Sequence, residues 1–348
     1  LHKRMALYVL AITGTSPARI LLGFMLSSFL LSMWISNTAT VMMLLPITLS
    51  LLNSMDAYYT KEDSNRFSAG LLLGVAYSAS IGGMATLVGT PPNLSFVRIF
   101  HIYFPDAAEV TFAQWMIFAF PLSLSLFIVV WAYLFIQFKP AAYRNKIAEK
   151  NLFRQQLQQM GKIKYEEKVV LVVFVLLALF WITRSNLAIG PFTLIGWSSF
   201  FPASKFINDG TVAIFMALLL FLIPSGEKNE KILDWETSSR LPWHILLLFG
   251  GGFALATGFK ESGLALWFGN QLSAFNMLPP IVVILLISLM VTFLTEVTSN
   301  TATTEMILPI LAGIAIQNNL NPLLLMIPAT LSASMAFMLP VATPPNAI

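Results

Sequence analysis

Two clusters of small polar residues interrupt otherwise apolar stretches of this chain, and both have the composition of an ion-binding site. Each begins with Ser-Asn-Thr, at Ser36 and at Ser299, and a Thr-Pro-Pro-Asn follows further along, at Thr90 and at Thr343. Asparagine and threonine side chains bring neutral oxygen acceptors together with N–H and O–H donors. Such groups can bind a cation and a small anion, whereas nucleophilic catalysis needs an activated nucleophile and a base, which these clusters lack.

The backbone at these clusters adds partial charges. A Ser-Asn-Thr turn ends one helix, whose free carbonyls suit cations, and starts another, whose free N–H groups suit anions. The prolines of Thr-Pro-Pro-Asn lack an N–H, which frees carbonyls four residues earlier and pushes Thr90 and Thr343 out of helical geometry. Gly89 permits a close approach, and Ala342 is nearly as small. The sequence therefore predicts two broken helices that face two hairpin tips.

The clusters belong to an internal repeat. Residues 36–47 read SNTATVMMLLPI and residues 299–310 read SNTATTEMILPI, which are identical at nine of twelve positions. The segment 139–168 carries eight Lys/Arg against three acidic residues, so we expect it in the cytoplasm. Counted outward from this segment, the first hairpin enters from the cytoplasm and the second from outside. This arrangement is an inverted repeat, which is typical of alternating-access transporters with a site at the membrane midplane.

The composition indicates that the whole chain is an integral membrane protein. Apolar residues make up 57% of the 348 residues and charged residues 10%, against about a quarter charged in soluble domains. Charge-free runs such as 122–138 and 169–182 have the length of transmembrane helices. The absence of cysteine excludes disulfides and thiolate metal sites. The net charge of +4 comes from loop residues that set topology, and it does not indicate a nucleic-acid partner.

We therefore expect an all-α polytopic membrane protein, an inverted-repeat transporter with two re-entrant hairpins and two broken helices. The first inverted repeat, with an interfacial helix, hairpin 1 and broken helix 1, is assigned to residues 1–104. A scaffold span (105–138), a cytoplasmic basic linker (139–168) and further scaffold spans (169–225) follow. The second inverted repeat, 226–348, has a span, an interfacial helix, hairpin 2 and a truncated broken helix 2. Because the chain stops two residues after its second Pro-Pro-Asn and lacks an initiator Met, we expect a fragment lacking N-terminal and C-terminal helices.

On its two Ser-Asn-Thr and two Thr-Pro-Pro-Asn motifs, the chain resembles the divalent-anion:sodium symporter family, which includes bacterial and animal di- and tricarboxylate transporters. The resemblance covers nearly the whole chain. It implies a homodimeric secondary transporter of the elevator type in the lipid bilayer of a bacterial inner membrane, and not an enzyme. It also implies import of C4-dicarboxylates (succinate, malate, fumarate) or of related di- and tricarboxylates such as citrate, with Na⁺ as the coupling ion and no cofactor.

The resemblance also implies binding residues, at the positions of this sequence that match the family's motifs. The first sodium site maps to Ser32, Ser36, Asn37 and Gly89. The second sodium site maps to Thr295, Thr298, Asn300 and Ala342. The substrate carboxylates map to Asn37, Thr38, Thr90, Asn300, Thr301, Thr343 and Pro344.

The lack of a basic residue at these clusters is itself an argument for cation coupling. The nearest one, Arg98, lies about two helical turns beyond Thr90. Importing a dianion against a potential of ~100 mV costs roughly 4.6 kcal/mol. Two co-transported Na⁺ would neutralise the dianion, and a third would let the potential drive uptake.

Several alternatives stay open. A sodium-independent dicarboxylate exchanger or a sulfate transporter of the same family would carry the same motifs. An intramembrane hydrolase is the alternative from another class, although the sequence has no HExxH, no GxSxG and no cysteine. Glu296 and Glu305 lie in the second copy, and a carboxylate within a membrane is a candidate functional group. For Glu305 we favour a contact with a polar neighbour at a domain interface, and for Glu296 both interpretations stay open.

Overall fold

The computed structural model describes residues 1–14, 16–55, 60–140, 152–189, 192–226, 230–241, 243–271 and 278–348. Helices dominate these residues, in agreement with the all-α class expected from the sequence. Three of them are long and apolar enough to cross a membrane: α4 (Lys61–Met84), α6 (Phe112–Phe138) and α13 (Pro280–Val297).

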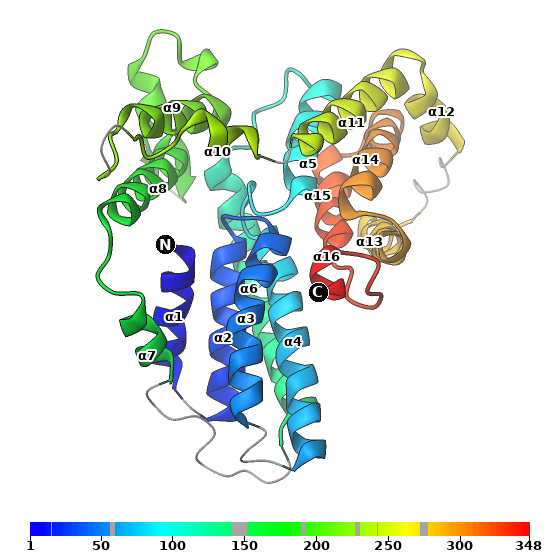
Figure 1. The fold of residues 1–348 in the computed structure, drawn as a ribbon. Helices are drawn as coiled ribbons and strands as arrows, with labels where there is room; N and C mark the ends of the chain where they lie inside the picture. Colours follow the sequence, from blue (N-terminus) through cyan, green and yellow to red (C-terminus); the bar gives the residue numbers. More distant parts are fainter. Residues whose placement is uncertain are drawn as a thin grey trace.

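The first part of the chain forms a bundle around α4 (Figure 1). Its other members are α1 (His2–Thr13), α2 (Pro17–Ser32), α3 (Asn37–Met55) and α6. The axes of α2 and α4 approach closely because Gly82 has no side chain, and a Cβ there would collide with the carbonyl of Phe29. Buried aromatic side chains, among them Phe24, Phe67 and Trp115, fill the space between the helices. This packing fixes the ends of α2 and α4, where the polar clusters lie.

The first polar clusters fall at helix ends, as the sequence predicts. Four residues, 33–36, separate α2 from α3, and the far ends of both helices lie at the same end of the molecule (Figure 1). Six non-helical residues, 85–90, separate α4 from α5 (Pro91–Tyr103). The helix is therefore broken before the prolines, as the sequence predicts. They stand at the first positions of a new helix, where a missing N–H leaves no bond unmade.

The middle of the chain contains elements that the sequence did not predict. Part of the segment predicted as a basic linker is helical and packs as α7 against α1, whereas residues 141–151 lie outside the described part. A small antiparallel pair of strands is also present, too short for a strand pattern to emerge from the sequence. The elements of this region are α7 (Leu152–Gln159), α8 (Tyr165–Thr183), β1 (Leu187–Ile189), β2 (Phe192–Leu194), the 3₁₀ turns Trp197–Phe200 and Ser204–Phe206, α9 (Asp209–Leu222), α10 (Trp235–Ser239), α11 (His244–Glu261) and α12 (Leu264–Gln271).

The last part of the chain repeats the order of the first. Residues 298–299 separate α13 from α14 (Asn300–Gln317), and residues 334–343 separate α15 (Pro322–Ala333) from α16 (Pro344–Ala347). The end of α14 and the start of α15 lie at the end of the molecule opposite to the end of α3 and the start of α4 (Figure 1). In both parts, the helices on either side of the Ser-Asn-Thr pack more on the following broken helix than on each other.

The two short helices that follow the breaks cross to the other half of the molecule. Helix α5 packs against α14 and α15, and α16 packs against α3 and α4. Each helix that starts at a Thr-Pro-Pro-Asn therefore lies beside the helix that starts at the Ser-Asn-Thr of the other copy. This exchange places helix N-termini from both copies in the interior of the molecule.

Candidate ion and anion site

The first Ser-Asn-Thr is positioned by hydrogen bonds within its own turn. Ser36 is the residue before α3, and its exposed hydroxyl accepts a bond from the Ala39 N–H (3.3 Å), which is a helix cap. The Asn37 side chain turns back toward α2, where its Oδ1 accepts a bond from the buried hydroxyl of Ser32 (2.6 Å). The turn therefore directs side-chain oxygens of Ser32 and Asn37 to one place.

Two glycines of the first broken helix pack against these oxygens. A Cβ on Gly83 would lie 2.5 Å from Asn37 Oδ1, and a Cβ on Gly89 would lie 2.5 Å from the Gly83 carbonyl oxygen and 2.9 Å from that of Ser32. Only residues without a side chain permit this approach. The result is a cradle of neutral oxygens from Ser32, Asn37 and Gly83, the kind of ligand that a hard cation such as Na⁺ takes.

The second Ser-Asn-Thr has the same local geometry. Ser299 caps α14 by accepting a bond from the Ala302 N–H (3.1 Å). The Thr295 hydroxyl lies 2.7 Å from Asn300 Oδ1 and 2.8 Å from the carbonyl oxygen of Ala333. Thr295 thus stands where Ser32 stands in the first copy, five residues before the asparagine. The buried Ala342 occupies the place of Gly89.

A second pair of asparagines, not assigned from the sequence, braces the two breaks. The Asn93 amide donates to the carbonyl oxygens of Gly83 (3.2 Å) and Thr86 (2.7 Å), which lie ten and seven residues earlier. The Asn346 amide donates to carbonyl oxygens at the same two offsets, those of Ala336 (2.9 Å) and Leu339 (3.2 Å). These asparagines end the repeated Thr-Pro-Pro-Asn, so the repeat itself carried the signal that could have identified them.

The predicted substrate residues lie at the starts of four helices. Thr90 and Thr343 are buried and have the same extended backbone, with φ/ψ of −145°/141° and −143°/143°. Thr38 is half-buried, Thr301 is buried and Pro344 is exposed. Within the described residues, the hydroxyl of Thr343 and the Oδ1 atoms of Asn93 and Asn346 are buried without a hydrogen-bond partner. Buried polar atoms without a partner are rare, so these oxygens are available to a bound ligand.

Two predicted sodium residues use their side chains elsewhere. The Ser36 hydroxyl is the helix cap described above, and the Thr298 hydroxyl bonds to the Leu294 carbonyl (2.9 Å) and to Thr303 Oγ1 (2.5 Å). The contacts at the two tips join Ser32, Asn37 and Gly89 in the first copy, and Thr295 and Asn300 in the second. The side chains of Ser36 and Thr298 lie at the rim of these clusters.

Glu296 holds the second break in place. Its buried carboxylate accepts three backbone N–H bonds, from Phe337 (2.8 Å), Met338 (3.0 Å) and Leu339 (2.8 Å). These residues follow the end of α15 and have left the helix, so their N–H groups need another acceptor. The corresponding residue of the first copy, Met33, is apolar, so the repeat gave no signal for this role.

Glu305 contacts a polar neighbour between the two halves, as we favoured from the sequence. It is 4% exposed, and its Oε1 accepts a bond from the buried hydroxyl of Ser95 on α5 (3.0 Å). Its carboxyl also packs directly on Gly252 of α11, where a Cβ would collide with it. A second contact joins the halves near the other break, where the Tyr77 hydroxyl donates to the Phe337 carbonyl (2.7 Å) and the two rings pack 4.9 Å apart.

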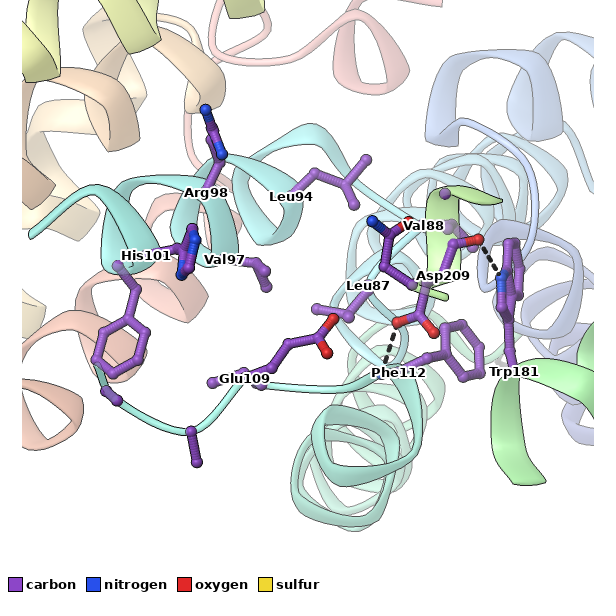
Figure 2. A pocket seen from close by; sticks show the side chains of 16 residues that line it. Leu87, Val88, Leu94, Val97, Arg98, His101, Glu109, Phe112, Trp181 and Asp209 are labelled. Carbon is purple, nitrogen blue, oxygen red and sulfur yellow. Dashed lines mark hydrogen bonds between the residues drawn. The ribbon is translucent and has the colours of Figure 1, made fainter. Parts of the chain in front are cut away.

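A cavity of about 440 Å³ lies beside the first break, between α5 and the N-terminal ends of α6 and α9 (Figure 2). Leu87 and Val88 of the break line it, and Arg98 of α5 and Glu109 lie at its wall (Figure 2). The cavity therefore has both charged and apolar side chains in its lining and borders the first break.

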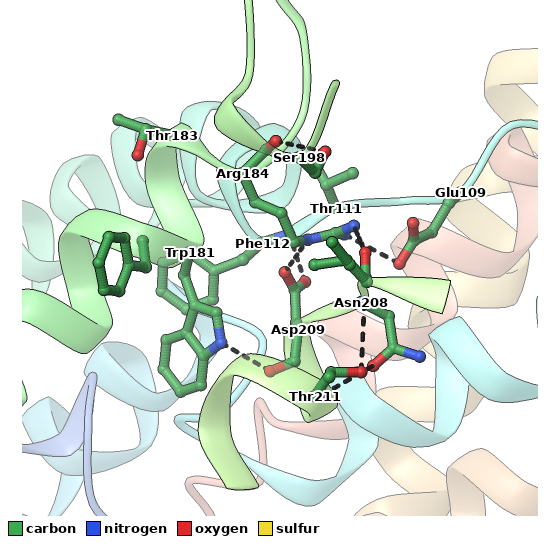
Figure 3. A network of polar contacts seen from close by, with 12 residues as sticks. Glu109, Thr111, Phe112, Trp181, Thr183, Arg184, Ser198, Asn208, Asp209 and Thr211 are labelled. Carbon is green, nitrogen blue, oxygen red and sulfur yellow. Dashed lines mark hydrogen bonds and ion pairs between the residues drawn. The ribbon is translucent and has the colours of Figure 1, made fainter. Parts of the chain in front are cut away.

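A buried arginine braces the far wall of this cavity (Figure 3). Arg184 pairs with Asp209 (2.6 Å) and Glu109 (3.0 Å) and also donates to the Ile207 carbonyl (2.8 Å). Asp209 in turn accepts the Phe112 N–H at the start of α6 (3.1 Å). Because both carboxylates are already paired with Arg184, the wall contributes rigidity and no free cationic group.

The chemistry of the two clusters is that of neutral oxygens. Across the described ranges, no three His, Cys, Asp or Glu side chains come together as a site for a transition metal would require. The groups that converge are hydroxyls, amide oxygens and backbone carbonyls, next to helix N-termini. Such a set can hold a monovalent cation and a carboxylate side by side.

Comparison with known proteins gives the same picture. The family described as the sodium:sulfate symporter transmembrane region matches residues 1–348. The sodium-dependent dicarboxylate transporter SdcS of Staphylococcus saprophyticus is 46% identical over 355 residues, and SdcS of Staphylococcus aureus strain USA300 is 44% identical over 358 residues. Each alignment covers 100% of this chain and 66% of the relative, so the chain spans just under two thirds of the length of these proteins. The chain belongs to the sodium:sulfate symporter family, that is, to the divalent-anion:sodium symporters.

Proposed function

We propose that the protein containing this chain is a secondary active transporter that imports C4-dicarboxylates such as succinate, malate and fumarate together with Na⁺. The observation that carries this proposal is the pair of matching clusters, each with a side-chain hydroxyl on a tip asparagine and an asparagine-braced break beside it. Two similar clusters, each of which we call a half-site, suit a substrate with a carboxylate at each end. The relatives named above are described as sodium-dependent dicarboxylate transporters, which supports the same substrate class.

Sodium is the cation that fits the first cluster. Carbonyl oxygens of Ser32 and Gly83 lie beside Gly89, Asn37 Oδ1 lies beside Gly83, and none of these oxygens carries a formal charge. A divalent cation would be expected to recruit carboxylates, whereas Na⁺ is held by carbonyl and hydroxyl oxygens at broken helices. In the second cluster, Thr295 and Asn300 would supply the equivalent oxygens, with Ala342 beside them.

The carboxylates of the substrate would be bound by N–H groups and hydroxyls at helix starts. Helix α5 begins after Thr90 beside α14, which begins at Asn300 and Thr301. Helix α16 begins after Thr343, at Pro344, beside α3, which begins at Asn37 and Thr38. Each such pair brings the N–H groups at the start of α14 or α3 beside the threonine that precedes α5 or α16, since the first two residues of α5 and α16 are prolines without an N–H. Since neither pair includes a basic side chain, co-bound Na⁺ would supply the positive charge.

Transport would follow an inverted-repeat, alternating-access scheme of the elevator type, in a homodimer in the bacterial cell membrane. Re-entrant hairpins at 17–55 and 280–317 and broken helices at 61–103 and 322–347 would form the moving domain. The opposite ends at which the two copies connect to their broken helices are what an inverted repeat needs. The remaining spans, including α6 and α8, would serve as the scaffold.

The decisive experiment is uptake of radiolabelled succinate by proteoliposomes that contain the full-length protein. We expect uptake with an inward Na⁺ gradient, little uptake with K⁺ in its place, and competition by malate and fumarate. Sodium-independent exchange of internal for external succinate would favour an exchanger instead. The proposal would be contradicted by succinate uptake that depends on neither a Na⁺ gradient nor internal succinate, or by no uptake at all.

Sulfate transport is the second candidate, because the matching family is described by sulfate. Sulfate is a compact dianion, whereas the two half-sites suit carboxylates at two ends of a longer molecule. Competition in the same uptake assay separates the two: succinate uptake that resists a hundredfold excess of sulfate supports a dicarboxylate carrier. An intramembrane hydrolase would instead cleave a substrate without moving succinate.

A further inference from the structure

One buried hydrogen bond joins helix α5 of the first half to helix α14 of the second. The hydroxyl of Ser95 donates to Glu305 Oε1 over 3.0 Å, and both side chains are buried, with exposures of 0% and 4%. The same carboxyl packs on Gly252 of α11, where a Cβ would collide with it. The carboxyl therefore contacts both α5 and α11.

The bond lies close to the helix starts that the proposed function uses. Ser95 is five residues after Thr90, and Glu305 is five residues after Asn300. At 1.5 Å per residue, both are about 7 Å along their helices. Since α5 and α14 run from the middle of the molecule toward the same end (Figure 1), the bond holds their N-termini at the same level.

The equivalent position in the other copy carries no carboxylate. The residue of α3 that matches Glu305 is Met42, whose side chain has no oxygen to accept such a hydrogen bond. Met42 against Glu305 is one of three differences between the two twelve-residue copies, so the carboxylate occurs in the second copy alone.

We propose that Ser95 and Glu305 are positioning residues for substrate: their hydrogen bond keeps the N-termini of α5 and α14 at the spacing that binds one of the two carboxylates. The inference rests on the proposed dicarboxylate transport. It assigns the preformed carboxylate-binding place to the starts of α5 and α14. In the first copy the position of Glu305 is occupied by Met42, so α3 has no carboxylate with which to form the same bond. The hydrogen bond between Ser95 and Glu305 thus influences the affinity for dicarboxylates without contact with them.

The test compares succinate uptake by variants of the full-length protein in proteoliposomes. Ser95→Ala removes the donor, and Glu305→Met inserts the residue of the first copy. We expect each to raise the KM for succinate about fivefold or more, in line with the loss of one buried hydrogen bond. The Na⁺ concentration for half-maximal uptake should change less than twofold, because the sodium oxygens lie on other residues.

Two further variants distinguish positioning from a general structural role. Glu305→Gln keeps an oxygen that accepts the Ser95 bond, so the KM for succinate should stay within twofold of wild type. Ser125→Ala is the matched control, because its hydroxyl bonds only within α6, to the Pro121 carbonyl (2.8 Å). Melting temperatures in detergent check that all variants fold.

The outcomes separate this inference from the one before it. Failure of the wild type to take up succinate overturns the proposed function. If the wild type takes up succinate and the folded Ser95→Ala and Glu305→Met variants have an unchanged KM, only the positioning role of Ser95 and Glu305 is overturned. A lower melting temperature and lower maximal rate at unchanged KM also overturns it, since that is what a purely structural contact would give.

Discussion

The two breaks of this molecule reach the same geometry by different means. In the first, six residues leave the helix, and the loop is held by the Thr86 hydroxyl, which donates to the Met33 carbonyl and accepts from the Gly89 N–H (3.1 Å). In the second, ten residues leave the helix, and the carboxylate of Glu296 collects three N–H groups. Met33 and Glu296 occupy the same place, four residues before the tip asparagine.

This difference shows what each copy must preserve and what it can vary. Both copies keep a hydroxyl five residues before the tip asparagine and an extended threonine before the prolines. Both also keep the asparagine of Thr-Pro-Pro-Asn, whose amide donates to the carbonyl oxygens ten and seven residues earlier. What varies is how the loop between them is supported: by the hydroxyl of Thr86 in the first copy and by the buried carboxylate of Glu296 in the second. The shared part is the part that we assign to ligands.

The largest loss of uptake is expected from substitution of the tip asparagines, Asn37 and Asn300. Replacement of Asn37 or Asn300 by alanine should each lower uptake about a hundredfold or more, because each removes an oxygen shared by a sodium cluster and a helix start. Uptake in proteoliposomes measures this, with melting temperature as the check on folding. Asn53→Ala, at an exposed position of α3, is the control. Normal uptake by either tip variant would show that the two copies do not share the site.

The glycine of the first break should be more sensitive than its counterpart. Gly89→Ala places a Cβ 2.5 Å from the Gly83 carbonyl oxygen, so backbone ligands must move, and the Na⁺ concentration for half-maximal uptake should rise about tenfold. The second copy already has an alanine, Ala342, at the equivalent position. Ala342→Gly should therefore change the Na⁺ concentration for half-maximal uptake less than twofold. Gly250→Ala, with open space around it, is the control. Equal effects of both changes would contradict the assignment of a tighter first cluster.

The carboxylate of the second break should be required for its stability. Glu296→Gln removes one acceptor oxygen and turns an amide N–H₂ toward backbone donors, which should lower the free energy of unfolding by about 2–4 kcal/mol. Thr86→Val in the first break should cost about 1–2 kcal/mol, because only one side-chain hydroxyl is lost. Melting temperatures in detergent measure both. A larger loss for Thr86→Val would reverse the proposed roles of the two supports.

The smallest effect is expected outside both clusters, where α1 meets the start of α8. The hydrogen bond from the Arg4 guanidinium (3.1 Å) lowers the pKa of Glu167 to about 2 from its ordinary 4.5. Because the pKa is lower in the folded state, the contribution is complete above pH 4.5 and is lost as the pH falls toward 2. The difference in melting temperature between wild type and Glu167→Gln should therefore be present at pH 7 and shrink below pH 4. A difference that grows on acidification would contradict this sign.

Much of the fold and of the candidate site followed from local signals. The turns that contain Ser36 and Ser299, the helix breaks at the two Thr-Pro-Pro-Asn segments and the non-helical Thr90 and Thr343 lie where the sequence predicts them. Helix α7 and the strand pair were missed because short elements give weak periodicity. Glu296 was left open because nothing in its own copy of the repeat identifies the three N–H groups that it accepts.

The sequence by itself determined the membrane class, the two copies and the residue types at each helix end, because these depend on composition, proline chemistry and spacing along one segment. Only the tertiary structure decided which oxygens converge, that Asn93 and Asn346 brace the breaks, and that Ser95 meets Glu305 across 210 residues. The physical reason is that a binding site needs groups from distant segments at distances near 3 Å. Those distances are set by how helices pack, where one missing Cβ at Gly82, Gly83 or Gly252 changes the approach.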